Sequence, residues 1–234
     1  MKLGIMQPYF FPYIGYWQLI NAVDKYVIYD DVNYIKGGWI NRNRILTRGE
    51  AKMITLHIKG ASQNKHINKI ETFTEAIHNK NLPATIRSCY GKAPFYSRVS
   101  SVIGNIISQD EKNLAKYLEF SIRQICDYLS IDTEIIVSST INKNNDLKGK
   151  EEVIEICKVL GQDEYINAIG GQELYSYDYF DASHIKLSFL KDKSCKYKQF
   201  NNEFVPSLSI IDVMMFNSKY KIKDMLEEYE LLGR

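Results

Sequence analysis

Residues 4–32, GIMQPYFFPYIGYWQLINAVDKYVIYDDV, decide the fold of this chain. The apolar runs at 3–6 and 26–32 are short and are bounded by turn residues and carboxylates, as β-strands are. Between them lies a segment whose apolar residues recur at helical spacing, namely Trp17, Leu19, Ile20 and Val23. Strand, loop, helix and strand make a βαβ unit, in which the strands are parallel and the crossover is right-handed. We therefore expect the first strand to lie in the centre of a parallel sheet.

The remainder of the chain continues with further strands and helices. EAKMITLHIKG at 50–60 has the pattern of a strand, and 90–131 supplies long amphipathic helices. TEIIVSSTI at 133–141 predicts a buried parallel strand, and the last segment, 208–233, predicts one or two closing helices. We expect one α/β domain over residues 1–234, with a parallel-sheet, Rossmann-like core, additional helices and a helical elaboration around 75–130.

Composition excludes several classes of protein. The hydrophobic share of 45% and the charged share of 25% are those of an ordinary globular protein. A formal charge of +2, with lysines and arginines dispersed, argues against a DNA-binding surface. The start lacks the features of a signal peptide and no apolar run is long enough to span a membrane, so we expect a cytoplasmic protein. The four cysteines and four histidines are scattered, which predicts reduced thiols and no metal site.

Polar or glycine-bearing segments follow the predicted strands. In open parallel sheets ligands bind beyond the carboxyl ends of the strands, where loops and helix N-termini meet. The segments at such ends are 7–16, 30–44, 138–150 and 170–175. We expect them to converge on one ligand site.

The first of these segments is stiffened by two prolines, which lowers the entropy cost of a preorganised pocket. Gly15 near the helix start would let a phosphate or carboxylate approach backbone N–H groups. Gln7, Tyr9 and Tyr16 are therefore candidate binding residues. The alternative is that the aromatic residues here only pack against the sheet, and this is the interpretation we favour for Trp17.

The second segment, DDVNYIKGGWINRNR at 30–44, is the densest polar cluster. Asp30 or Asp31 could act as a general base or hold a divalent cation. Lys36 and Arg42 could grip a diphosphate, and Trp39 could stack on a base or sugar. Other candidate binding residues here are Asn41, Asn43 and Arg44. The alternative is a surface hairpin with internal Asp–Arg pairing.

Three further features carry weaker signals. His57, on a predicted strand, could reach the same pocket as a catalytic residue, although a lone histidine is more often hydrogen-bonded in the core. Gly170 and Gly171 permit either a tight turn or the close approach of a ligand to the backbone. Lys148 and Lys150 around Gly149 form either an anion-binding turn or a solvated one. No GxSxG, GxGxxG or GxxxxGK[ST] motif is present in the sequence.

The N-terminal stretch resembles the signature of the WbqC-like family of bacterial polysaccharide gene clusters. The likeness runs through QPYFFPYIGYWQLINAVDKYVIYDDVNYIKGGWINRNRI, and YGKAPFY, YINAIGGQELY and LSIIDVMMF are similar to later landmarks of that family in the same order. The resemblance implies transfer of glycine, or another acyl group, to an amino sugar during O-antigen assembly.

PYIGYWQLINAVDKYVIYDD is also similar in layout to the HxGH region of nucleotidylyltransferases, with Tyr13 and Tyr16 in place of the two histidines. Neutral tyrosines cannot supply the imidazolium charge that stabilises a transferring phosphoryl group. This likeness therefore implies the fold and the pocket location, and argues against adenylyl transfer.

Together these features predict an N-acyltransferase that acts on a nucleotide-linked amino sugar. Asp30, Asp31, Arg42 and His57 are the candidate catalytic residues. The acyl or aminoacyl donor could be an acyl-carrier protein, an aminoacyl-tRNA, coenzyme A, or a free acid with ATP and Mg²⁺. Two alternatives are a divergent nucleotidylyltransferase or ATP-dependent ligase, and a non-catalytic nucleotide-sugar binding module.

Overall fold

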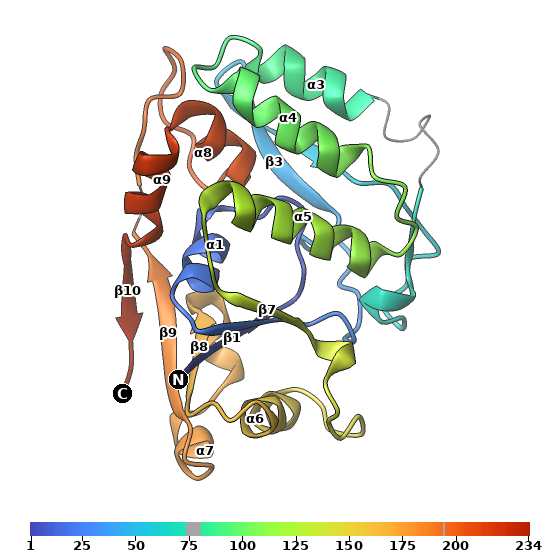
Figure 1. Cartoon of the computed structure of the whole chain (residues 1–234), viewed down its shortest axis with the longest axis vertical. Helices are drawn as coiled ribbons and strands as arrows, with labels where there is room; N and C mark the ends of the chain where they lie inside the picture. The colour runs from blue at the N-terminus through green and yellow to red at the C-terminus, as the bar shows by residue number, and fades with distance from the viewer. Residues whose placement is uncertain (74–80, 194) are drawn as a thin grey trace.

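The computed structural model describes residues 1–73, 81–193 and 195–234 (Figure 1). Its centre is a six-stranded sheet in the order β10-β9-β8-β1-β2-β7, and only the pair β9–β10 is antiparallel. The strands are β1 Lys2–Met6, β2 Lys25–Ile28, β7 Glu134–Val137, β8 Glu164–Ala168, β9 Lys186–Asp192 and β10 Tyr229–Leu232. The protein thus has a mixed α/β fold with a largely parallel sheet, and the predicted central position of β1 is confirmed.

Helices cover both faces of this sheet (Figure 1). One face is covered by α1 Ile14–Asn21, α5 Leu114–Leu129 and α9 Lys219–Leu226, and the other by α6 Lys150–Val159 and α7 Tyr177–Asp181. The strands serve both cores because successive side chains point to opposite faces: Tyr26 and Ile28 join the first core, and Val27 joins the second. A Cβ on Gly4 would lie 3.2 Å from the Tyr26 ring, so this glycine allows α1 to pack closely on β1.

The remaining elements lie beyond the first face, at the top and right of Figure 1. They are β3 Arg42–Thr47, β4 Glu50–Thr55, β5 Ile58–Lys59, β6 Glu71–Thr72, α3 Asn81–Tyr90, α4 Tyr96–Ile107 and α8 Ile210–Phe216. Short 3₁₀ turns are η1 Ile67–Lys69, η2 Ser138–Thr140 and η3 Ile169–Leu174. The helices α3, α4 and α5 fall within the predicted helical region around 75–130, of which residues 75–80 lie outside the described residues.

Three strand predictions need correction. The strand β7 is parallel, as predicted, but it forms a half-buried edge of the sheet, because its outer side has no neighbouring strand among the described residues. The strand predicted at 50–60 ends at Thr55, so His57 lies in the connection to β5. The tail ends in β10 as well as in helices, because pairing with β9 overrides the helical pattern.

The carboxyl ends of the parallel strands meet at one edge of the sheet. The five parallel strands, numbered 1 to 5 in chain order, are β1, β2, β7, β8 and β9. Across the sheet they are arranged 3-2-1-4-5, so the direction in which successive strands are added changes between β1 and β8. Ligands of open α/β sheets bind outside the carboxyl ends, near such a reversal. The loops after the parallel strands β1, β2, β7, β8 and β9 are therefore the places to look for a site.

Candidate functional site

A cavity of about 380 Å³ lies beyond the ends of β2 and β7, at the start of α6. We call it the carboxylate pocket. Its lining residues are Asp31, Val32, Asn33, His66, Ser139, Asn145, Leu147, Lys148, Gly149 and Glu152. The first turn of α6 has backbone N–H groups without intrahelical partners, and the N-terminus of a helix attracts negative charge.

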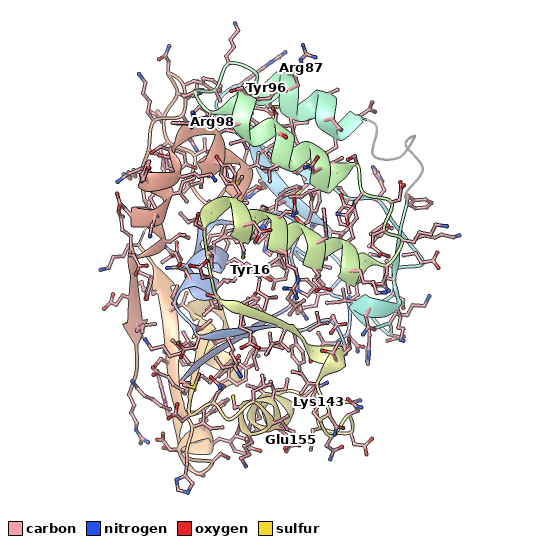
Figure 2. All side chains as sticks on the ribbon, viewed as in Figure 1. Tyr16, Arg87, Tyr96, Arg98, Lys143 and Glu155 are labelled. Atoms are coloured by element: carbon pink, nitrogen blue, oxygen red, sulfur yellow. The ribbon has the colours of Figure 1, made fainter. Side chains whose placement is uncertain are left out.

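A buried lysine sits behind this pocket. The Lys143 Nζ atom lies 2.5 Å from Asp31 Oδ2 and 3.4 Å from Glu152 Oε1, and the Lys143 side chain is only 1% exposed. The Tyr29 hydroxyl donates a 2.5 Å hydrogen bond to Glu152 Oε2. In Figure 2, Lys143 lies beside α6, below the end of β7. One cation therefore orients two carboxylates that face the same cavity.

Asp31 keeps one oxygen free of protein partners. Its Oδ2 atom accepts the bond from Lys143, whereas its buried Oδ1 atom has no hydrogen-bond partner among the described residues. A buried carboxylate oxygen normally accepts a hydrogen bond, because leaving it unpaired is costly. The Asp31 side chain is 14% exposed and lines the pocket, so rotation of the carboxylate would bring this unsatisfied acceptor to a ligand N–H or O–H.

Asp30 has a different environment from its neighbour. It is 2% exposed, and its carboxylate accepts hydrogen bonds from the Ser139 backbone N–H, the Ser139 hydroxyl and the Asn68 side-chain amide, at 2.9, 2.7 and 3.1 Å. These contacts fasten the end of β2 to η1 and η2. Asp30 therefore holds the pocket walls together and lies outside the pocket lining.

A second cavity, of about 290 Å³, lies beyond the ends of β1 and β9. We call it the aromatic pocket. Its lining residues are Tyr9, Pro12, Tyr13, Trp39, Asn43, Arg44, Asp192 and Ser207. The Arg44 guanidinium lies 5.6 Å from the centre of the Trp39 ring, so a cation and an indole share one wall.

The proline-stiffened loop and the 30–44 segment lie side by side at the aromatic pocket. The Phe10 N–H donates to Trp39 O at 3.1 Å, and the buried Asn43 amide donates to Phe10 O and Phe11 O at 3.1 and 2.9 Å. Phe11 has a φ of 46°, a conformation that a bulky residue adopts only when its surroundings enforce it. Asn43 supplies that constraint.

Burial changes the acidity of two pocket phenols. Burial and the nearby Asp192 carboxylate raise the pKa of Tyr13 to about 12, and burial raises the pKa of Tyr9 above its usual value. Both hydroxyls are therefore protonated at neutral pH. They offer a ligand apolar ring faces and O–H donors, without negative charge.

Two residues of the 30–44 segment close their own loop. The Arg42 guanidinium donates to Gly37 O and, at 3.0 Å, to Gly38 O. Asn41 accepts a hydrogen bond from the Tyr34 hydroxyl at 2.8 Å and donates to Leu56 O at 2.9 Å. Lys36 is exposed on the same loop. None of the three lines the carboxylate or the aromatic pocket.

The other candidate residues also lie outside the two linings. Tyr16 is buried between the sheet and α5 (Figure 2), and its hydroxyl donates to Gln7 O at 3.1 Å. His57 is exposed beyond β4. Gly170 and Gly171 lie in η3, where a Cβ on Gly171 would come within 2.4 Å of the Asn167 amide nitrogen, so a side chain there would require Asn167 to move.

The sequence did not single out Lys143, Glu152 or Asp192 as site residues. Lys143 lies within the 138–150 segment expected at the site, but in that segment only Lys148 and Lys150, which flank Gly149, have the pattern of an anion-binding turn. Glu152 belongs to the first turn of α6, where acidic residues are common because of the helix dipole. Asp192 ends β9, a strand that the sequence pattern did not reveal.

The protein is thus an α/β protein with two cavities along the carboxyl edge of a largely parallel sheet, which is where α/β proteins commonly bind small molecules. Residues 7–224 match the family model described as the WbqC-like protein family, so the chain belongs to that family. The chain is also similar to an uncharacterized protein of Mycobacterium tuberculosis, Rv1507c, with 28% identity over 232 residues that cover 96% of this chain and 97% of that protein. No solved structure gives a significant match. None of the helices in the described residues has both the length and the apolar character needed to cross a membrane.

Proposed function

We propose that this chain is a cytoplasmic transferase of cell-surface polysaccharide (O-antigen) biosynthesis. It acts as a single domain and transfers an acyl or aminoacyl group, such as glycyl, to the amine of a nucleotide-linked amino sugar. The observation that carries the proposal is Asp31, whose Oδ2 is held by buried Lys143 while its Oδ1 has no partner among the described residues. Membership of the WbqC-like family is compatible with such an enzyme.

In this proposal Asp31 is the general base. The sugar amine donates an N–H to the Asp31 carboxylate as its nitrogen attacks the acyl carbonyl. The new C–N bond forms, the bond from carbon to the leaving group breaks, and the proton taken by Asp31 passes to the leaving group. Lys143 keeps the carboxylate oriented, and the side-chain amides of Asn33 and Asn145, which line the same pocket, can donate to the developing oxyanion.

The nucleotide end of the substrate is assigned to the aromatic pocket. Tyr9 and Trp39 offer ring faces for a base, and Arg44 offers a positive charge for a phosphate. β9 and β2 are three strands apart in the sheet, which is about 14 Å at roughly 4.8 Å per strand. The proposal therefore requires one extended nucleotide diphosphate sugar to reach from one pocket to the other.

The test is a transfer assay. The purified chain is incubated with thymidine- or uridine-linked amino sugars and with acyl-carrier, aminoacyl-tRNA, coenzyme A or ATP-activated donors, and N-acylated product is measured by mass spectrometry. Asp31→Asn should lower the rate about 100-fold or more. Asp132→Asn, at an exposed position outside the pockets, is the matched control. The proposal fails if no donor gives product and no amino sugar binds.

The strand order supports a second candidate, a divergent nucleotidylyltransferase or ATP-dependent ligase that uses Mg²⁺. The arrangement 3-2-1-4-5 is that of doubly wound, Rossmann-like sheets, which favours a nucleotidylyltransferase-like core. Against this activity, Tyr16 replaces a histidine and is buried with its hydroxyl bonded to Gln7 O. Release of pyrophosphate from ATP with Mg²⁺ would favour this candidate. A chain that binds amino sugars tightly with every donor yet never turns over would instead be a binding module.

A further inference from the structure

A third cavity, of about 540 Å³, lies where the β3–β4 turn meets the end of α3 and the loop at 199–202. We call it the basic pocket. Its lining residues are Leu46, Thr47, Arg48, Arg87, Ser88, Cys89, Gly91, Lys92, Phe200 and Asn202. It shares no lining residue with the carboxylate or the aromatic pocket. Its volume is within the range of roughly 300–1,000 Å³ that small-molecule sites occupy.

The basic pocket carries uncompensated positive charge. Arg48, Arg87 and Lys92 line it, and no carboxylate does. In the part of the chain that the structure describes, none of these three cations forms an ion pair. The sequence also contains no Asp or Glu between 76 and 109, which is the stretch that carries α3 and α4. The end of α3 contributes a partial charge of about −0.5, which offsets only part of the three positive charges.

Specific backbone conformations and side-chain contacts hold the walls of this pocket in place. Arg48 and Gly49 both have positive φ, at 52° and 83°, as a tight hairpin turn requires. A Cβ on Gly49 would lie 3.1 Å from Asn202 Oδ1, so the hairpin turn and the 199–202 loop are in close contact. Phe200 also has a φ of 52°, and its ring packs against Phe216 with the ring centres 4.7 Å apart. A tight hairpin turn and a loop with an aromatic residue at positive φ therefore meet at one cavity.

We propose that the basic pocket binds the phosphate groups of a small molecule. Arg48, Arg87 and Lys92 supply the charge, and the Ser88 hydroxyl and Asn202 amide supply neutral hydrogen-bond donors. A nucleic-acid polymer is disfavoured, because it requires many phosphate contacts along a basic track, whereas this chain has a formal charge of only +2. Arg87 lies at the top of the molecule (Figure 2), remote from Lys143 of the carboxylate pocket, so the proposal does not depend on the transfer reaction.

The test measures binding, with no need for turnover. Isothermal titration calorimetry of the purified chain with pyrophosphate, ADP and coenzyme A distinguishes a bare diphosphate from a nucleotide and from a pantetheine-bearing nucleotide. We expect at least one of them to bind with a Kd below about 1 mM, and more weakly as salt rises. Arg87→Ala/Lys92→Ala should weaken that binding about tenfold or more, whereas the charge-conserving Arg87→Lys/Lys92→Arg should retain most of it.

The control variant is Lys112→Ala/Lys116→Ala, which removes two exposed lysines from outside the pocket. Equal weakening by this control would overturn the proposal, because it would show a general charge effect. Absence of binding by all three compounds would overturn it as well. Binding of an RNA oligonucleotide without binding of any small compound would show that the patch serves a polymer, which also contradicts the proposal.

Discussion

Replacement of Lys143 by methionine is the sharpest test of the buried charge cluster. The Lys143 side chain is 1% exposed and its ammonium lies 2.5 Å from Asp31 and 3.4 Å from Glu152. Methionine retains most of the apolar stem, so little packing is lost. The two carboxylates remain at the same place without their cation. Removal of one partner from a buried ion pair costs about 3–5 kcal/mol. We expect Lys143→Met to lower the free energy of unfolding by an amount in this range, a large share of the roughly 5–15 kcal/mol that such a protein has.

Urea unfolding followed by the fluorescence of Trp17 and Trp39 measures this change. The dependence of the free energy on urea should keep its slope, because the surface exposed on unfolding is the same. Glu152→Gln in the Lys143→Met background should recover about 1–3 kcal/mol, since residues in one network are not additive. Lys116→Met, at an exposed position, is the control. A loss below about 1 kcal/mol, or strict additivity of the two changes, would refute the reasoning.

Three further predictions concern other parts of the molecule. Asp212→Ala should destabilise the protein by about 3 kcal/mol or more, measured by urea unfolding, because buried Asp212 accepts hydrogen bonds from Tyr90, Tyr197 and Gln199; a change near zero would contradict this. Asn43→Ala should lower the free energy of unfolding by about 2–4 kcal/mol and weaken the binding of ligands in the aromatic pocket, because the Asn43 amide holds the loop that contains Pro8 and Pro12. An unchanged melting temperature and an unchanged ligand affinity would count against this prediction. Tyr13 has a pKa of about 12 in the folded state, above its unfolded value of about 10, so the folded state binds more protons between these pH values and stability falls as pH rises. Tyr13→Phe should therefore show a shallower alkaline loss in melting temperature, and an identical loss would refute the assignment.

Local patterns were enough to predict the centre of the fold. The βαβ unit at 4–32 is decided by neighbours in sequence, because helical and strand periodicity are both read over a few residues. The expected convergence of four segments on one site is met only in part. Tyr9 lies with Trp39 and Arg44, as their positions after two adjacent strands predict, whereas Asp31 and Ser139 line a separate cavity and 170–175 lines neither. Such reasoning locates a site without saying which side chains enter it.

Hydrogen bonds and ion pairs between residues far apart in the chain could not be predicted from the sequence. Asp30 and Asp31 are adjacent, and only the folded structure shows that Asp30 binds Ser139 while Asp31 binds Lys143. The Ser209 hydroxyl caps α8 by accepting from the Ile211 N–H at 3.2 Å, a contact between neighbours in sequence. Asp212 lies in the same turn, but its donors Tyr90, Tyr197 and Gln199 come from other parts of the chain, so the local pattern does not reveal it as a buried acceptor.

The hydrogen bonds of Asp30 have a consequence for how relatives of this protein can diverge. The Asp30 carboxylate connects the segments around residues 30, 68 and 139 by hydrogen bonds. None of these segments can therefore shift outward on its own to make room for a bulkier ligand. A relative that accepts a larger molecule would have to replace Asp30 and both of its partners together, or trim side chains such as Val32, His66 and Leu147 while keeping the backbone fixed. Natural variation in selectivity should therefore accumulate at those three side chains and spare Asp30.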